Sequence, residues 1–590
     1  MDTEAEAKAL YHIAFVKRDL GNLTEGLSDI EAAVKLIEQI RSDINSERGR
    51  TLFLSSKQDY YKLYIDLLMQ LHKKNPNDGY DAKALTVSER SRARSLLDLL
   101  TEANANIRQG VDPELLNKER TLQQELNELE QSRVKLLSGQ YTNKQLTELK
   151  QQIKYLLIEL ERLKEQIRVT SPRYANLKYP EPLTLQEIQQ QVLDDNTLLL
   201  EYSLGEERSY LWAVTKTGIT SYSLPLRADI EAAAQEFYKQ LTSGEEVSPE
   251  VAMKLSQMLL APVANQLGQK RLLIVSDGAL QSIPFAALPI PETTSPPAPL
   301  LQGEGSNSPP SLLGKGAGGL GFTPLLVQHE IVTLPSASTL AVLRRELKGR
   351  SPAAKTVAVI ADPVFSTKDD RFLSSQPPQS NTTTRTSEVK RSATDIGVIL
   401  DRLKYSRTEA ETILSLVPAT ERSSALDFAA SRTTATSRDL AQYRMVHFAT
   451  HGLLNNVHPE LSGVVLSLVD EKGADTNGFL RLQDIFNLNL PAELVVLSAC
   501  ETGLGKDVQG EGLVGLTRGF MYAGAKRVAV SLWSVNDVAT SELMKKFYQQ
   551  MLEKGVNPVA ALRAAQLEMM KTQAWKAPYY WAAFVVQGEY

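Results

Sequence analysis

The chain contains a single cysteine, Cys500, in a position that favours chemistry. It follows a short apolar run, 494–497, that is typical of a buried strand, and a glycine-rich stretch comes after it. A thiolate is a strong nucleophile, but a thiol with the ordinary pKa of about 8.5 is mostly protonated at neutral pH. Cys500 therefore needs a neighbouring base if it is to attack a substrate.

A histidine in a matching position can supply that base. His451 follows the apolar run 444–449 and precedes Cys500 by 49 residues. In open α/β sheets the reactive groups sit on loops just past the carboxyl ends of strands, so these two residues should meet at one edge of a sheet. An imidazole there can take the thiol proton and later protonate a leaving amine. We interpret Cys500 and His451 as a catalytic dyad.

Backbone N–H groups beside the dyad are the expected oxyanion hole. The oxyanion of a tetrahedral intermediate needs such donors, and the N–H groups of Gly452 and Cys500 are our candidates. His447 lies inside its predicted strand rather than at the end, so we expect it to be a core residue. The alternative is a purely structural role, in which Cys500 is a small buried residue and His451 is a core histidine whose hydrogen bonds are made within the fold.

Several motifs around these residues resemble the CHAT family, a caspase-like peptidase domain found beside TPR repeats and related to separase. They are HFATHG (447–452), LSACETG (497–503), GEGL (510–513), SLWSVND (531–537) and YWAAF (580–584). A weaker likeness continues upstream, so that about 180–590 is covered. The resemblance implies a caspase-like α/β fold, a dyad of His451 and Cys500 and a degenerate first half that supports the catalytic half. The spacing of His451 and Cys500 also matches the caspase signature.

The resemblance gives Asp537 a role in specificity. In separase-like relatives an acid in this region lines the S1 pocket and selects arginine, and a carboxylate can pair bidentately with a guanidinium group. Asp537 would then favour Arg or Lys at P1. The alternative is that Asp537 is the N-cap of the helix that begins before Ala539, because Asp is a favoured capping residue.

Composition excludes several classes of protein. The net charge is -5 and no long basic block occurs, so direct nucleic-acid binding is not expected. No apolar run of about 18 residues is present and the N-terminus is acidic, which predicts a cytoplasmic protein with no membrane contact. One cysteine excludes an intramolecular disulfide and a Cys-based zinc site.

The front of the chain is predicted to be all helical. Residues 1–110 read as TPR-like paired helices, with a turn at 21–23 and a break at 75–79. A stack needs three or more repeats and a cap, so this segment looks incomplete and is consistent with a chain cut from a longer protein. Residues 111–170 carry leucine stripes, the second with alternating spacings of three and four, which predict an antiparallel coiled-coil hairpin. Repeat surfaces bind proteins, so we expect a protein partner here, besides a protein substrate.

The remainder is predicted to be an α/β domain. Residues 180–405 correspond to the degenerate half and residues 406–590 to the catalytic half. Within the catalytic half, the apolar runs 444–449, 463–468, 494–497 and 527–532 suit strands of a parallel sheet buried on both faces. Two insertions, 291–321 and 366–392, are rich in Pro, Gly, Ser, Thr and charge and should be unstructured.

Other motifs in the sequence have rival interpretations. Residues 510–515 spell G-x-G-x-x-G, but a loop of about ten residues separates them from their strand, unlike a dinucleotide site. Gly505-Lys506 lacks the remaining residues of a P-loop. His447, His451, His458 and Glu460 lack the helix of H-E-x-x-H enzymes, so neither metal nor cofactor is expected. The serious alternative is a non-catalytic TPR-type scaffold that carries a caspase-like domain.

Overall fold

The computed structural model describes most of the chain. The described residues are 3–44, 53–54, 56–104, scattered positions between 112 and 129, and 143–170, 182–291, 320–373, 400–453, 462–498, 511–533 and 536–590. No helix in this part of the chain is long and apolar enough to cross a membrane.

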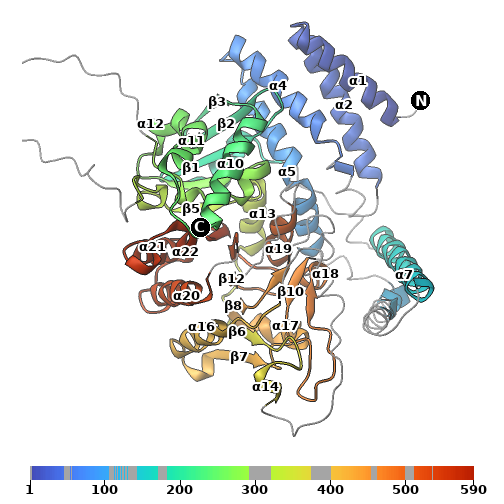
Figure 1. The fold of residues 1–590 in the computed structure, drawn as a ribbon. Coiled ribbons are helices and arrows are strands. Elements are labelled where there is room, and N and C mark those ends of the chain that lie inside the picture. Colours follow the sequence, from blue (N-terminus) through green and yellow to red (C-terminus); the bar gives the residue numbers. More distant parts are fainter. Residues whose placement is uncertain are drawn as a thin grey trace, which may run out of the picture.

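Two helical hairpins make up the N-terminal part of the chain, drawn in blue in Figure 1. They consist of α1 (Thr3–Asp19), α2 (Leu23–Asp43), α4 (Gln58–Lys74) and α5 (Tyr80–Asn104). Gly21, at φ 81, makes the tight turn of the first pair, a conformation that glycine adopts without steric cost. Each helix packs on the next, and the core between them contains Ile30, Tyr61 and Leu67. The turn and the break predicted from the sequence are both observed.

Helix α7 (Asn143–Thr170) carries the second leucine stripe. Leu163 and Ile167 pack against Leu115 and Leu122. Leu160 packs against Leu122 and Leu129, together with Leu149 and Leu156 of α7 itself. Contacts that run forward along one segment and backward along the other are those of an antiparallel pair.

One mixed, mostly parallel sheet organises the rest of the described chain. Its strand order is β3-β2-β1-β4-β5-β14-β13-β12-β8-β6-β7. The bounds are β1 (Thr197–Ser203), β2 (Ser209–Thr215), β3 (Gly218–Leu224), β4 (Arg271–Val275), β5 (Ile331–Thr333), β6 (Lys355–Pro363), β7 (Arg422–Asp427), β8 (Tyr443–Ala449), β12 (Leu494–Leu497), β13 (Arg527–Ser531) and β14 (Phe584–Gly588). The predicted α/β fold with a mostly parallel sheet, preceded by helices, is confirmed.

The last strand joins the two halves of this sheet. β14 runs parallel to β5 of the first half and antiparallel to β13 of the second. β6 lies between β8 and β7, so it belongs with the strand that precedes His451. The division at residue 406 stays a prediction from the sequence; in the sheet, β6, which begins at Lys355, lies beside β8.

Helices cover both faces of the sheet. The larger ones are α9 (Leu185–Gln191), α10 (Arg227–Thr242), α11 (Pro249–Leu259), α13 (Ala337–Leu347), α16 (Lys404–Ser415), α19 (Glu511–Tyr522), α20 (Asp537–Leu552) and α21 (Pro558–Met570). Short helical turns are α12 (Ala264–Leu267), α14 (Asp370–Leu373), α17 (Arg432–Ala435), α18 (Leu482–Phe486) and α22 (Pro578–Trp581). Alternate residues of β6 show the layering: Val357 and Val359 join a core with α16 and α20, whereas Ala358 and Ile360 join one with α19.

A separate three-stranded sheet flanks the end of β8. It consists of β9 (Gly452–Leu453), β10 (Gly463–Val465) and β11 (Phe479–Arg481), all antiparallel. The apolar run 463–468 was predicted to be a strand of the parallel sheet, and this prediction is wrong. Only 463–465 is a strand, and it pairs with the residues that follow β8 rather than with β8 itself.

The structure describes the margins of the two segments that were predicted to be unstructured insertions. Residues 366–373 form a turn and α14, and Arg371 of α14 takes part in ion pairs. Leu320 is buried. These residues contradict the prediction that 291–321 and 366–392 are unstructured throughout; residues 292–319 and 374–399 lie outside the described part.

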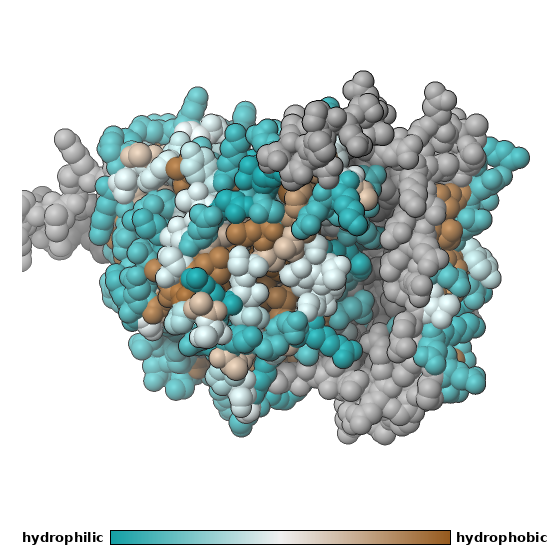
Figure 2. All heavy atoms as spheres, turned by 90° about the horizontal axis from the view of Figure 1, so that it is seen from below, coloured by the Kyte–Doolittle hydropathy of each residue, from teal (hydrophilic) through white to brown (hydrophobic). Residues whose placement is uncertain are grey.

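The underside of the molecule carries apolar surface. Figure 2 shows this surface in the middle of the face, with hydrophilic residues around it.

Candidate functional site

His451 lies two residues past the carboxyl end of β8. The strand beside β8 is β12, which runs parallel to it with Leu497 opposite Phe448. The Ser498 N–H donates to the Phe448 carbonyl at 2.8 Å. Parallel strands end at the same edge, so the chain leaves β8 and β12 side by side. Cys500 itself lies outside the described residues.

The imidazole of His451 is held by a backbone carbonyl. Its Nε2 is 2.7 Å from the carbonyl oxygen of Asp401, and the Phe365 ring lies 5.2 Å from it between centroids. Because a carbonyl only accepts, Nε2 carries the proton and Nδ1 has the lone pair that can accept one. The side chain is only 2% exposed. This burial lowers the pKa of His451, and the Asp401 carbonyl opposes that shift in part.

The backbone of His451 is fixed by the small sheet. The Val465 N–H donates to the His451 carbonyl at 2.8 Å, and the next pair of the ladder is Gly452 with Val464. Hydrogen-bonded and non-bonded pairs alternate in an antiparallel ladder, so the Gly452 N–H is directed away from β10. That orientation is compatible with the oxyanion role expected for Gly452.

His447 belongs to the core, as the sequence predicts. It is fully buried, with Nδ1 3.0 Å from the Tyr548 hydroxyl and Nε2 2.8 Å from Glu409 Oε1. Glu409 is on α16 and Tyr548 on α20. The residue therefore ties two helices to β8 and has a structural role in the core.

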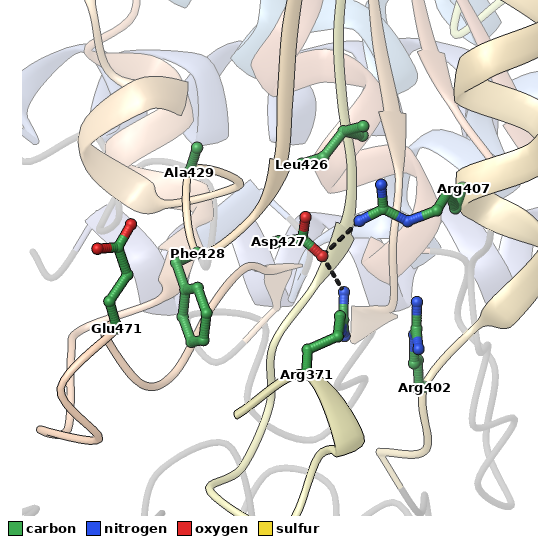
Figure 3. Close-up of a pocket in the computed structure, with 8 residues that line it drawn as sticks. All are labelled: Arg371, Arg402, Arg407, Leu426, Asp427, Phe428, Ala429 and Glu471. Atoms are coloured by element: carbon green, nitrogen blue, oxygen red, sulfur yellow. Dashed lines mark hydrogen bonds and ion pairs between the residues drawn. The ribbon is translucent and has the colours of Figure 1, made fainter. Parts of the chain in front are cut away.

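A cluster of arginines and aspartates surrounds the carboxyl ends of β6 and β7. We call it the strand-end cluster, and it comprises Asp362, Asp369, Arg371, Arg402, Arg407 and Asp427. Arg371, Arg402 and Arg407 line a pocket of about 480 Å³ together with Asp427, Phe428 and Glu471 (Figure 3). Three guanidinium groups face three cluster carboxylates, so the pocket has no excess positive charge for an anion.

Asp537 has a structural bond that the sequence did not predict. Asn536 rather than Asp537 is the N-cap of α20, and its side chain accepts from the N–H groups of Val538 and Ala539. The predicted alternative of an Asp537 N-cap for this helix is therefore wrong. Asp537 Oδ2 instead accepts the Tyr405 N–H at 2.8 Å, in the first turn of α16. Burial raises the pKa of Asp537, and the Tyr405 bond opposes that shift.

The sequence did not predict the residues around the imidazole. Asp401, Arg402 and Asp362 carry no spacing that points to a histidine. The end of β6 was detectable, since an apolar run, 357–361, stops at Asp362-Pro363.

The rival motifs find no support in the described residues. β12 ends at Leu497 and α19 begins at Glu511, so residues 510–515 do not open directly from their strand. Within the described residues no three His, Cys, Asp or Glu side chains gather as a metal site would require. His458 and Glu460 lie outside the described part.

Comparisons with known proteins give a family and distant structural likenesses. The family model described as CHAT domain matches residues 249–589, more than half of the chain. Tetratricopeptide repeat protein 28 of Homo sapiens and that of Mus musculus are each 37% identical over 109 residues, which is 18% of this chain and 4% of each relative. The chain thus spans a small fraction of these curated relatives.

Two kinds of solved structure are similar to the chain. A separase–securin complex of Saccharomyces cerevisiae at 3.0 Å has a TM-score of 0.39 and 9% identity, covering 99% of this chain and 53% of that one. The Arg-specific cysteine proteinase gingipain R has a TM-score of 0.29 and 12% identity, covering 61% of this chain and 74% of that one.

Proposed function

Because this chain belongs to the CHAT domain family, we propose that it is a cysteine endopeptidase with Cys500 as nucleophile and His451 as base. The observation that carries the proposal is the state of the His451 ring. Nε2 is bonded to the Asp401 carbonyl, which makes Nδ1 the proton acceptor, at the edge where β8 and β12 both end. Phe448 and Leu497 lie opposite each other in β8 and β12. His451 and Cys500 each follow these residues by three positions in the sequence, so we expect both at the same edge of the sheet.

The dyad would act by acyl transfer. His451 Nδ1 takes the Cys500 thiol proton, and the sulfur attacks the carbonyl carbon of the scissile peptide bond. The N–H groups of Gly452 and Cys500 would stabilise the oxyanion of the tetrahedral intermediate. His451 then gives its proton to the leaving amine, and water, activated by the same ring, hydrolyses the thioester.

New termini in a proteome test this function. Purified wild type and Cys500→Ala are incubated with a cell lysate, and new N-termini are mapped by mass spectrometry. We expect termini that only the wild type generates, because sulfur is required for attack. Equal sets from both proteins would exclude Cys500 as nucleophile. Cellular function that survives Cys500→Ala, with partner binding intact, would support the scaffold alternative.

For specificity, we propose that Asp537 selects a basic P1 residue. Its carboxylate is half-buried and one oxygen accepts from Tyr405, so an arginine would compete with or add to that bond. We expect Arg or Lys before the wild-type cleavage sites, and an Asp537→Asn variant should lose that preference by roughly tenfold or more, the scale of a charge-assisted bond. A Met or Leu preference in the mapped sites would reject this role.

The helical hairpins are proposed to bind a partner protein that recruits or gates the protease. The hairpins are attached to the α/β domain, since α4 and α5 contact the first half of the sheet through charged groups. Lys62 pairs with Asp277, and Arg92 donates to the carbonyls of Ser276 and Tyr202. Buried polar contacts of this kind need defined geometry, so the hairpins have a defined orientation on the α/β domain.

A further inference from the structure

The orientation of the base depends on a peptide group outside any helix or strand. Asp401 precedes α16, which begins at Lys404, and its side chain is exposed. Its carbonyl is nevertheless 2.7 Å from His451 Nε2. A loop peptide keeps one orientation only if neighbouring contacts fix it.

The next residue supplies such a contact. Arg402 Nε and Nη2 donate to the two oxygens of Asp362 at 2.9 and 2.8 Å. This parallel pair of bonds fixes the guanidinium plane as well as its distance, which a lysine cannot do. Asp362 is only 1% exposed, so the bonds lie in a poorly screened environment.

Asp362 is itself firmly held. It lies near the end of β6, where Ala361 is opposite Ala449 of β8, and it also accepts from Arg407 and pairs with Arg371. Among the described residues, Asp362 and Asp427 are the non-glycine residues with positive φ, at 49° and 54°. Such backbone persists only where the surroundings impose it, and it gathers at functional sites.

These contacts form a closed ring. It runs from β8 across to β6, from Asp362 to Arg402, through one peptide to the Asp401 carbonyl, and from there to His451, which follows β8. We infer that Arg402 and Asp362 are positioning residues for the base: their ion pair orients the Asp401 carbonyl, which in turn holds the ring with Nδ1 as proton acceptor. The inference rests on the proposed function of the dyad.

Arg407 provides a matched control. It also bonds Asp362, with Nε 2.8 Å from Oδ2, but it lies within α16, away from the Asp401 peptide. Removing either arginine takes one guanidinium group from the same carboxylate. Only Arg402 is joined directly to the peptide that contacts His451.

The single cysteine allows a test that needs no substrate. The pH dependence of iodoacetamide alkylation of the full chain reports the thiolate of Cys500. An unassisted thiol has a pKa of about 8.5 and is only a few per cent thiolate at pH 7. We expect Cys500 of the wild type to be alkylated at a lower pH than an unassisted thiol. Arg402→Gln should be alkylated about 3- to 10-fold more slowly than the wild type at pH 7, because its base is misoriented. Arg407→Gln should stay within about twofold of wild type.

Each outcome bears on a separate claim. Coinciding profiles for Arg402→Gln and Arg407→Gln, whether shifted or not, would overturn the positioning role, since the cluster would then act only through stability. If the wild type and His451→Ala both react as ordinary thiols, the dyad itself fails and the inference fails with it. Thermal melts verify that both arginine variants are folded. Arg402→Lys should recover part of the rate, because it keeps the charge but not the paired bonds.

Discussion

Replacing His451 with Ala is expected to lower kcat/KM for a cleaved peptide by about 10²- to 10⁴-fold, the usual contribution of a general acid–base. The variant retains the thiol but has no group to remove its proton or to protonate the leaving amine. Peptides from the mapped termini serve as substrates. His447→Gln is the matched control: it also removes a buried imidazole, but one that lies within β8 and is bonded to Tyr548 and Glu409. It should affect stability more than the chemical step.

The effects of His451→Ala and Cys500→Ala on the rate are expected not to add. Residues that act as one unit lose nearly all their contribution when either is removed. Cys500→Ala and the double variant should therefore have the same residual rate within error. A double variant that is slower by the product of the two single effects would show that His451 and Cys500 act independently, which contradicts a dyad.

The wild-type pH profile belongs to this prediction. Burial lowers the pKa of His451 from its ordinary value of 6.5. The ring is then neutral, and able to accept a proton, down to a pH below 6.5. The acidic limb of kcat/KM should accordingly lie below pH 6.5 and disappear in His451→Ala. The stability of the fold changes in the same direction. His451 binds a proton at a higher pH in the unfolded state than in the folded state, so the free energy of unfolding decreases as the pH falls below 6.5.

The elements that position the site were predictable where local patterns are strong. The runs ending at Ala449 and Leu497 form β8 and β12. The sequence patterns of 511–523, 538–554 and 557–571 predict helices, and these ranges agree with α19, α20 and α21 to within about two residues. These segments are apolar on the faces they bury, so their periodicity reports their structure. The prediction for 463–468 was wrong in two respects: only 463–465 forms a strand, and that strand joins the small sheet, because an apolar run does not reveal which sheet it pairs with.

The surroundings of the imidazole were not predictable. The contact from Asp401 is made by a backbone carbonyl, which every residue has, so no residue type marks it. Asp362 and Arg402 are 40 residues apart in the sequence, and they meet only because the fold brings the residue before α16 back over β6. Residues 366–392, which lie between Asp362 and Arg402 in the sequence, were predicted to be unstructured from their composition. Composition alone does not reveal that residues beside such a segment belong to a site.

The helical hairpins depend on a buried carboxylate on α4. Asp66 accepts from Arg18 of α1 at 3.1 Å, from Gln70 of its own helix at 2.9 Å and from Tyr210 of β2 at 2.6 Å. Arg208 adds two further bonds. Burial opposes the ionisation of Asp66, but the bonds from Arg208 and Tyr210 outweigh it and lower its pKa. One side chain of α4 thus joins α1 of the other hairpin and its own helix to the sheet.

Asp66→Ala is expected to weaken the attachment of the hairpins by about 3 kcal/mol, the lower range for removing one partner of a buried pair, since Arg208 is partly exposed and screened. Native-state hydrogen exchange should show lower protection of α4 amides, with β12 and β13 unchanged. Lys83→Ala is the control, because Lys83 and Glu31 join α5 to α2 at the surface, where a pair contributes at most about 1 kcal/mol. Equal loss of protection in α4 and the central strands would mean that Asp66 stabilises the whole molecule rather than the attachment. Because the folded-state pKa of Asp66 lies below its ordinary value of 3.8, the wild-type attachment should be intact above that pH and weaken as the pH falls through the lower value; the variant should show no such acid-dependent step.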